Sequence, residues 1–229
     1  MVKFFIDTGD ISKVEEYKKL GIFDGVTTNP MLVTKEGGDM RKDFKEFNLK
    51  MLNVAGDIPV SIEVTCNDYD GMVKEAHELA RLGKNVVIKI PMHKDGIIAC
   101  KTLTDEGIKV NVTACMNARQ CLIAASAGAT YASIFFARVY DMGYDPVPII
   151  REAVTFLDEH NANKRFDRRT DLIVGSLRSL YDIDQAIRSG AHILTVPYRF
   201  IDGMIYHVRT EETINEFLKN WQDDRKIKN

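Results

Sequence analysis

The sequence predicts an α/β protein, a (β/α)8 TIM barrel formed by a single domain over residues 1–229, with one further helix near the C-terminal end. Three observations predict this fold. A chain of 229 residues suits one barrel better than two smaller domains. Short β-branched or aromatic runs alternate with stretches of helical apolar spacing. Finally, no glycine-rich phosphate loop follows the first run, as an open nucleotide-binding sheet would usually have. Polar residues instead recur where most runs end, as the mouth of a barrel requires.

Eight runs have the length and composition of strands. They begin at Val2 (VKFFIDT), Gly25 (GVTTN), Val60 (VSIEV), Val86 (VVIKIP), Val110 (VNVTAC), Tyr131 (YASIFF), Asp171 (DLIVGS) and Ile193 (ILTVP). The helices expected between and after them are Ile11–Leu20, Met40–Val54, Asp68–Leu82, Asp95–Asp105, Asn117–Ala127, Pro146–His160, Leu180–Ser189 and Phe200–His207. Strict alternation indicates a parallel sheet, closed as a barrel or open and doubly wound. A last amphipathic segment, about Glu211–Trp221, carries the only tryptophan.

The composition excludes several classes of function. Lys and Arg number 31 against 33 Asp and Glu, and this balance gives no electrostatic footprint for nucleic acid. No run of 18 apolar residues is present, so we expect no membrane association. The 4 cysteines lack metal-ligand spacing and the 5 histidines are scattered, so we expect reduced thiols, a cytoplasmic location and no metal site.

A lysine interrupts the apolar fourth strand. A parallel strand is buried on both faces and should be almost continuously hydrophobic, yet Lys89 lies within VVIKIP. Alternation along the strand turns Lys89 into the barrel together with Val87 and Pro91. Burial there would favour the neutral amine, which is the form that attacks carbonyl groups. The alternative is a structural lysine that reaches solvent or pairs with Glu63.

Other strands also direct polar side chains inward. The same alternation predicts this orientation for Asp7, Thr27, Asn29, Ser61, Glu63, Thr65, Asn111, Thr113 and Cys115. A packed core would need a hydrogen-bond partner for every one of these groups. A water-filled active site at the barrel mouth explains them more simply, and a buried polar network that fixes the strand register is the alternative.

Two arginines follow neighbouring strands at the same mouth. Arg138 follows the sixth strand and Arg178 the seventh, close to Ser176. Guanidinium groups bind phosphate oxygens in a bidentate geometry, so this pair could grip a phosphate from two sides. The alternative for each arginine is a surface position where it pairs with a carboxylate.

Taken together, these segments resemble the transaldolase and fructose-6-phosphate aldolase family, in particular its branch of small subunits. The resemblance runs almost from end to end. It rests on FIDT, DGVTTNP, VSIEV and VVIKIP, followed by NVT, AGATYAS–FFAR, GSLR and TVP. The combination of GVTTNP with VIKIP is highly specific. We expect sugar phosphates as ligands and neither a metal nor another cofactor.

The resemblance implies a role for each of the polar residues. Lys89 would form a Schiff base with the ketose, and Asp7 would handle the proton of the substrate C4 hydroxyl. Glu63 and Thr113 would orient a water and shuttle protons. The expected substrate-binding residues are Thr28, Asn29, Asn111, Ser133, Phe135, Arg138, Ser176 and Arg178. Asn29 and Ser133 would hold the dihydroxyacetone end, and Arg138, Ser176 and Arg178 would hold the phosphate.

Two positions place the chain on the transaldolase side of this resemblance. Aldolases of the family carry Gln at the position of Glu63 and Tyr at that of Phe135, whereas its transaldolases carry Glu and Phe. Release of free dihydroxyacetone requires a proton donor beside the bound enamine, which a phenol supplies and a phenyl ring cannot. We therefore expect a class I transaldolase that transfers dihydroxyacetone from fructose 6-phosphate to an aldose phosphate, as in the pentose phosphate pathway.

Departures from the family pattern concern the substrate and leave alternatives open. The usual SPFVGR reads SIFFAR, Tyr198 and Arg199 follow TVP, and Asn161–Arg169 is unusually basic, changes expected near the mouth. A fructose-6-phosphate aldolase, a transaldolase for another anionic ketose such as a sulfonated sugar, and a non-catalytic barrel that binds sugar phosphate are the alternatives. The resemblance also implies homo-oligomeric rings, pentamers or decamers, in which Glu211–Trp221 could dock on a neighbour.

Overall fold

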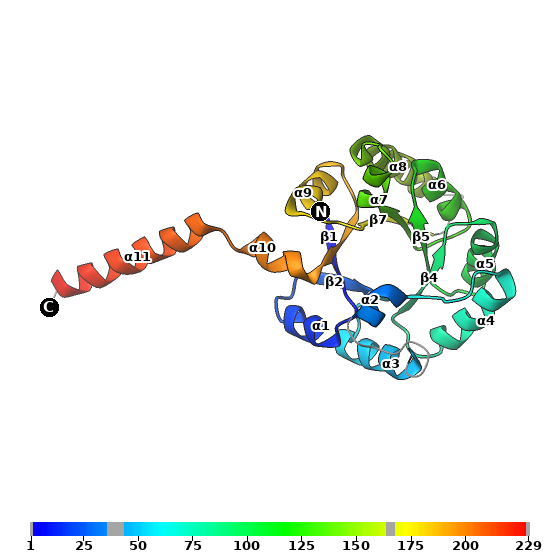
Figure 1. Cartoon of the computed structure of the whole chain (residues 1–229), viewed down its shortest axis with the longest axis horizontal. Helices are drawn as coiled ribbons and strands as arrows, with labels where there is room; N and C mark the ends of the chain where they lie inside the picture. Colours follow the sequence, from blue (N-terminus) through cyan, green and yellow to red (C-terminus); the bar gives the residue numbers. More distant parts are fainter. Residues whose placement is uncertain (1, 36–43, 164–167, 228–229) are drawn as a thin grey trace.

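The computed structural model of the protein describes residues 2–35, 44–163 and 168–227. Its centre is a closed barrel of eight parallel strands in sequence order, with the last strand paired to the first (Figure 1). The strands are β1 Lys3–Asp7, β2 Phe23–Thr27, β3 Val60–Glu63, β4 Val86–Pro91, β5 Val110–Cys115, β6 Tyr131–Phe135, β7 Asp171–Gly175 and β8 Ile193–Pro197. The predicted (β/α)8 TIM barrel is confirmed.

Helices cover the outside of the barrel between successive strands, and η1, α10 and α11 follow the last strand (Figure 1). They are α1 Ile11–Lys18, α2 Pro30–Lys35, α3 Phe44–Ala55, α4 Tyr69–Ala80, α5 Lys94–Asp105, α6 Ala118–Ser126, α7 Phe136–Asp141, α8 Pro146–Ala162, α9 Leu180–Arg188, the 3-10 turn η1 Tyr198–Phe200, α10 Ile201–Ile205 and α11 Val208–Ile227. Side-chain caps fix several starts. The Asp68 carboxylate accepts the Gly71 N–H at α4, and the Ser179 hydroxyl accepts the Asp182 N–H at α9.

Some helical segments differ from the sequence prediction. The short helices α2 and α7 were not predicted. The helix expected over Met40–Val54 is observed as α3, and residues 40–43 lie outside the described residues. The stretch Phe200–His207 is a 3-10 turn followed by α10, and α11 extends beyond Glu211–Trp221 at both ends. The shifted bounds lie at helix ends, which are the least certain part of a sequence prediction, and α2 and α7 have six residues each, too few to show a helical period.

The two ends of the barrel interior differ in polarity. At the N-terminal ends of the strands, Phe5, Ile173 and Ile193 pack together with Tyr131 against them. The rings of Phe5 and Tyr131 meet edge to face, with 5.7 Å between centroids. A Cβ at position Gly25 would lie 2.6 Å from the Phe5 ring, so only glycine leaves room for this apolar plug. Space for a polar site is therefore left at the C-terminal ends.

Two residues expected inside the barrel lie elsewhere. β3 ends at Glu63, and Thr65 beyond it is exposed, with its backbone N–H and hydroxyl donating to the Glu75 carboxylate. In β5 an extra residue forms a bulge against β6, and Ala114 has a φ of 61°. The bulge reverses the alternation of side chains, so Cys115 packs in the outer core between the strands and helices.

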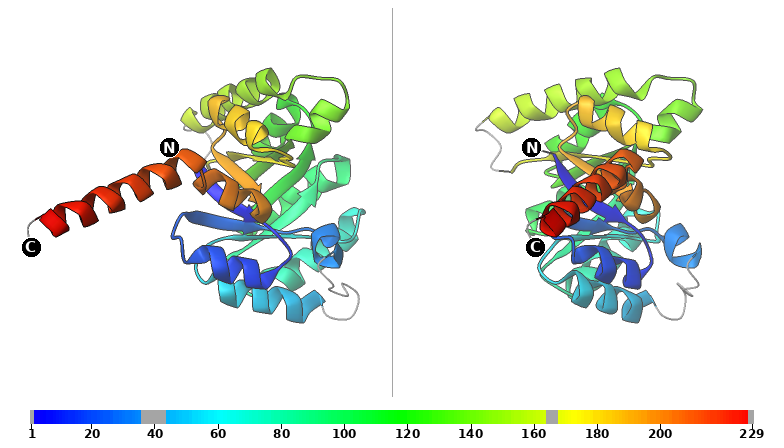
Figure 2. Two further views of the ribbon diagram at one scale, coloured as in Figure 1. Left: turned by 60° about the vertical axis from the view of Figure 1, so that its left-hand side comes forward. Right: turned by 90° about the vertical axis from the view of Figure 1, so that its left-hand side faces the viewer.

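The C-terminal helix α11 extends away from the barrel (Figures 1 and 2). Every side chain from Asp202 to Trp221 is exposed. The large apolar residues Ile214, Phe217, Leu218 and Trp221 recur at intervals of three and four, which places them on one face of the helix. No helix in the described part of the chain is both long and apolar enough to span a membrane.

Candidate active site

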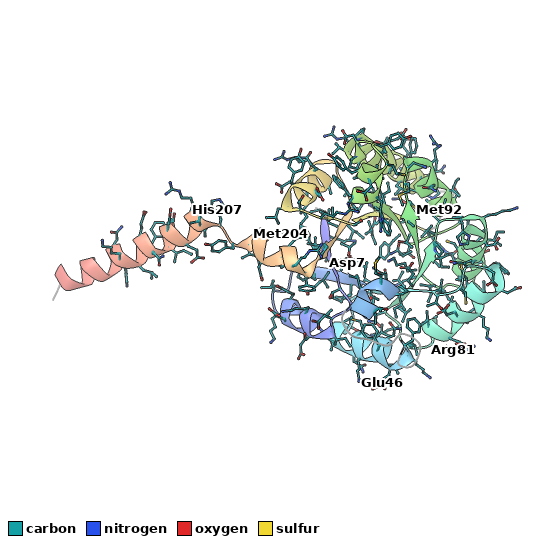
Figure 3. The ribbon with its side chains drawn as sticks, in the orientation of Figure 1. Asp7, Glu46, Arg81, Met92, Met204 and His207 are labelled. Atoms are coloured by element: carbon teal, nitrogen blue, oxygen red, sulfur yellow. The ribbon has the colours of Figure 1, made fainter. Side chains whose placement is uncertain are left out.

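A cavity of about 530 Å³ opens at the C-terminal ends of the strands, the end at which (β/α)8 barrels carry active sites. All the predicted site residues except Thr28 and Glu63 line it: Asp7, Asn29, Lys89, Asn111, Thr113, Ser133, Phe135, Arg138, Ser176 and Arg178. Figure 3 shows Asp7 near the centre of the ring of elements. Residues that are far apart in the sequence are therefore brought together by the closure of the barrel.

Lys89 lies inside the barrel on β4, with 6% of its side chain exposed. Its ammonium nitrogen is 2.9 Å from Oε2 of Glu63, which is its register partner on β3. The same nitrogen donates to the backbone carbonyl of Thr28 at 3.3 Å, while the Thr28 side chain is buried outside the cavity lining. A carboxylate at this distance can accept the ammonium proton and so provide the neutral amine that attacks a carbonyl.

Amide and hydroxyl groups border Lys89 on the next strands. The Ser133 hydroxyl donates to Asn111 Oδ1 at 2.7 Å, and Asn111 Nδ2 donates to Ser61 Oγ at 3.2 Å. These two bonds orient the Asn111 side chain across three strands. The Thr113 hydroxyl is buried, belongs to a residue that lines the cavity, and has no hydrogen-bond partner among the described residues. It can therefore bind a water or a substrate oxygen.

Asn29 and Phe135 complete this part of the lining. The Asn29 side-chain carbonyl accepts the Leu32 backbone N–H at 3.0 Å in the first turn of α2, which fixes the orientation of the amide. Phe135 is the last residue of β6 and pairs in register with Gly175 of β7. Its ring offers no proton donor to a group bound in the cavity.

Asp7 ends β1 and is held by two threonines. The Thr27 hydroxyl donates to Asp7 Oδ1 at 2.7 Å, and the Thr195 hydroxyl is hydrogen-bonded to that of Thr27. Burial raises the pKa of Asp7 above its ordinary value. The positive charge of Lys89, the Thr27 hydrogen bond and the charge of Arg199 oppose this rise in pKa. A carboxyl group in this environment can take up and return a proton during a reaction.

The predicted phosphate clamp lies on α7 and the loop after β7. Arg178 donates from both terminal nitrogens to Asp141, at 2.7 and 2.6 Å, a pairing that raises the pKa of Arg178 and lowers that of Asp141. Arg138 forms no ion pair with a described residue. Ser176 has a φ of 58°, and its carbonyl accepts the Ala137 N–H at 3.2 Å, which ties the two segments together. Arg178 therefore pairs with a carboxylate at the same time as it lines the cavity.

Several lining residues were not predicted as members of the site, among them Thr195 and Arg199. Thr195 lies on the inward face of β8, so the alternation rule that selected Asp7 could have found it. Arg199 follows the end of a strand, as the two predicted arginines do. Its guanidinium carbon lies 4.6 Å from the centre of the Phe200 ring. A cation at the mouth is thus present beside Asp7 as well as at the clamp.

In the basic segment Asn161–Arg169, none of the described residues (161–163, 168 and 169) lines this cavity, contrary to expectation. Residues 164–167 lie outside the described residues. Arg168 and Arg169 precede β7 and border a separate cavity of about 270 Å³ beside the residues that precede β5 and β6. Because the chain enters each strand at the end opposite the mouth, these charges lie away from the site. Within the described residues, no group of three or more His, Cys, Asp or Glu side chains could hold a metal ion.

Known proteins are similar to this chain over nearly its whole length. A sequence model of the family described as Transaldolase/Fructose-6-phosphate aldolase matches residues 4–228. A protein of Clostridium acetobutylicum named probable transaldolase is 41% identical over 222 residues, a match that covers 97% of this chain and 98% of that relative. A protein of Carboxydothermus hydrogenoformans with the same name is 42% identical over 221 residues, which are 96% of this chain and 98% of the relative. A probable transaldolase of Methanococcus maripaludis is 41% identical over 221 residues, again covering 96% and 98%. The chain belongs to the transaldolase/fructose-6-phosphate aldolase family.

Proposed function

We propose that the protein is a class I transaldolase, which transfers a dihydroxyacetone unit from fructose 6-phosphate to an aldose phosphate through a Schiff base on Lys89. The observation that carries this proposal is the position of Lys89. Its amine is nearly buried, borders an open cavity and has Glu63 at 2.9 Å as a proton acceptor. An amine held in this way is suited to attack on a ketone.

The first half of the reaction follows from these contacts. Glu63 takes a proton from the Lys89 ammonium, and the free amine adds to the substrate C2 carbonyl. Glu63 and Thr113 then move protons so that the C2 oxygen leaves as water and a Schiff base forms. Asp7 accepts the proton of the C4 hydroxyl while the C3–C4 bond breaks. Glyceraldehyde 3-phosphate leaves, and the three-carbon enamine stays on Lys89.

The second half reverses these steps with a different aldehyde. The enamine carbon attacks the aldehyde of an aldose phosphate such as erythrose 4-phosphate, and Asp7 returns its proton to the new hydroxyl. Water then hydrolyses the Schiff base with the help of Glu63 and Thr113. Asn29, Asn111 and Ser133 are placed to hold the dihydroxyacetone end, and Arg138, Ser176 and Arg178 to hold the phosphate.

Reductive trapping tests this proposal directly. Incubation with fructose 6-phosphate and borohydride should reduce the Schiff base and add a dihydroxyacetone-derived mass to the peptide that contains Lys89. Lys89→Met should lose the adduct and the transferase activity, whereas Lys94→Met, which removes an exposed lysine on α5, should keep both. A Lys89→Met enzyme with full turnover would refute covalent catalysis through Lys89. A parent that binds fructose 6-phosphate but neither forms the adduct nor turns it over would favour a barrel that only binds sugar phosphate.

We further propose that the protein is a cytoplasmic homo-oligomer, a pentamer or decamer. The apolar face of α11 supports the oligomer. Phe217 and Trp221 on it are 66% and 61% exposed, and burial against a second copy would remove this apolar surface from water. The cytoplasmic location is supported by the four cysteines, all of which are free thiols in the structure.

A further inference from the structure

We propose that Thr27 and Thr195 are positioning residues, which form a hydroxyl relay that holds Asp7 in both of its protonation states. This inference rests on the proposed function, in which Asp7 accepts the C4 hydroxyl proton and later returns it. Neither threonine needs to touch the carbon atoms that react. Their part is to keep the carboxyl group in one orientation while its proton comes and goes.

The relay lies where β1, β2 and β8 meet. Asp7 pairs in register with Thr27 on one side and with Pro197 on the other, and Thr195 lies two residues before Pro197. Thr27 Oγ1 is 2.7 Å from Asp7 Oδ1 and is also hydrogen-bonded to Thr195 Oγ1. Thr27 and Thr195 are only 3% and 6% exposed, so solvent competes little for these bonds.

A hydroxyl group both donates and accepts, so this chain of contacts can run in two directions. When Asp7 is a carboxylate, Thr195 donates to Thr27 and Thr27 donates to Asp7. When Asp7 is protonated, it donates to Thr27, and Thr27 donates to Thr195. The contact between the two threonines is compatible with either direction. Rotation of two hydroxyl groups therefore accommodates the proton without a movement of the backbone.

Charged groups on several elements also face Asp7. Burial raises its pKa and so does Glu63 of β3, whereas Lys89 of β4 and Arg199 of η1 lower it. The Thr27 hydrogen bond also lowers it, because a donated hydrogen bond stabilises the carboxylate. Removal of the Thr27 hydroxyl should therefore favour the protonated form. Cleavage starts from the carboxylate, so the acidic limb of the pH profile should move to higher pH.

The decisive variant is Thr27→Val, compared with Thr27→Ser. Thr27→Val should lower kcat for the cleavage half-reaction on the order of 10- to 100-fold, the range for loss of a hydrogen bond to a charged group. Its acidic limb in kcat/KM should lie at higher pH than that of the parent. Thr27→Ser keeps the hydroxyl and should restore both the rate and the pH profile. A merely structural threonine would leave the profile unchanged.

Two further variants control for packing. Thr195→Val keeps the bond from Thr27 to Asp7 and should shift the acidic limb less than Thr27→Val does. Thr104→Val removes a buried hydroxyl that donates to the Ala127 carbonyl at 2.8 Å, away from Asp7. It should lower the melting temperature without moving the pH profile. A Thr104→Val profile that moved like that of Thr27→Val would overturn the relay.

Borohydride trapping of dihydroxyacetone tests the proposed function independently of this inference. Dihydroxyacetone has no C4 hydroxyl, so its trapping on Lys89 does not require Asp7 to accept that proton. The parent and Thr27→Val should trap it equally. Failure of the parent to trap would refute the proposed function. If Thr27→Val traps normally and cleaves fructose 6-phosphate with the parental rate and pH profile, the relay is refuted. If Thr27→Val does not fold, the pH profiles of Thr195→Val and the parent are compared. A shift of the acidic limb to higher pH supports the relay, and an unchanged profile refutes it.

Discussion

Lys89 and Glu63 form a contact that serves the fold and the proposed reaction at once. A nearly buried ammonium loses its hydration, which costs several kcal/mol per ion, and an adjacent carboxylate recovers only part of this. An apolar side chain at position 89 would avoid that cost. The pair lies at the open end of the barrel, where an amine and a proton acceptor have a chemical use. The alternative reading of Lys89 as a paired lysine thus describes the resting state of the proposed nucleophile.

Phe135 provides the residue-scale prediction, which separates transfer from simple cleavage. Phe135→Tyr would place a phenol in the lining beside the enamine, where it can protonate carbon and release dihydroxyacetone. The parent should turn over rapidly only with donor and acceptor together, with ping-pong kinetics. Phe135→Tyr should release dihydroxyacetone from fructose 6-phosphate alone at least about 10-fold faster than the parent, within the range general acid catalysis supplies. A coupled assay for glyceraldehyde 3-phosphate measures this.

The matched control is Phe135→Leu, which alters the ring without adding a hydroxyl. It should leave the release of dihydroxyacetone slow, and Glu63→Gln added to Phe135→Tyr should reinforce the release. If Phe135→Leu releases dihydroxyacetone as fast as Phe135→Tyr, a looser cavity and not a proton donor controls the outcome. A parent enzyme that releases dihydroxyacetone as fast as it transfers it would be an aldolase.

At the scale of elements, alternation along strands predicted most of the strand residues that line the cavity, because a closed parallel barrel obeys it almost everywhere. It correctly brought Asp7, Lys89 and Asn111 to the interior. It was wrong for Cys115, because the bulge at Ala114 depends on a left-handed backbone conformation that no glycine marks in the sequence. The helix α7 was also not predicted, since six residues after a strand show too little periodicity.

The pairing of Arg178 was not assigned from the sequence either. Its carboxylate partner, Asp141, lies on α7, one turn after Arg138, and neither spacing nor alternation relates α7 to the loop after β7. The sequence left open whether each arginine grips a phosphate or pairs with a carboxylate. The structure shows the carboxylate contact for Arg178 and leaves Arg138 facing the cavity without an ion pair to a described residue. The packing of α7 beside the loop after β7 therefore adds Asp141 to the residues that can influence anion binding.

α7 gives the element-scale prediction. Asp141 and Arg178 are 42% and 51% exposed, so solvent screens their ion pair and a phosphate dianion can compete for the guanidinium. Arg138→Ala should raise KM for fructose 6-phosphate about 10- to 100-fold with kcat little changed, since the contact persists from ground to transition state. Asp141→Asn removes the competing charge and should lower KM severalfold. Steady-state kinetics at constant ionic strength measures both.

The control for charge alone is Asp184→Asn, on the exposed surface of α9, which should leave KM unchanged. Trapping of dihydroxyacetone, which has no phosphate, should be unaffected in all of these variants. An Asp141→Asn enzyme with a raised KM would show that Asp141 orients Arg178 for the phosphate and does not compete with it. Unchanged kinetics in Arg138→Ala would mean that the clamp is misplaced.

At the scale of the whole molecule, the two ends of the barrel differ: one end is packed with apolar side chains, and the other carries the candidate active site. The apolar plug of Phe5, Ile173 and Ile193 closes one end, and the polar cavity opens at the other. In the proposed reaction this division keeps a Schiff base accessible from one side only. Beyond β8 the chain leaves the barrel, and Met204 and His207 in Figure 3 mark the segment that leads to α11. The described side chains of α11, from Val208 to Trp221, are exposed, so the largest-scale prediction concerns assembly with other copies of the chain.

The apolar face of α11 should hold copies of the chain together. Burial of one large apolar side chain contributes roughly 1.5–3 kcal/mol, and Ile214, Phe217, Leu218 and Trp221 share one face. A glutamate at the centre of that face would place a charge in an apolar contact, which is costly. If the protein forms the proposed pentamer or decamer, Phe217→Glu should therefore shift it to smaller species in sedimentation velocity, whereas Lys219→Glu on the opposite face should not. Equal masses for the parent and Phe217→Glu would show that the apolar face of α11 does not hold the assembly together.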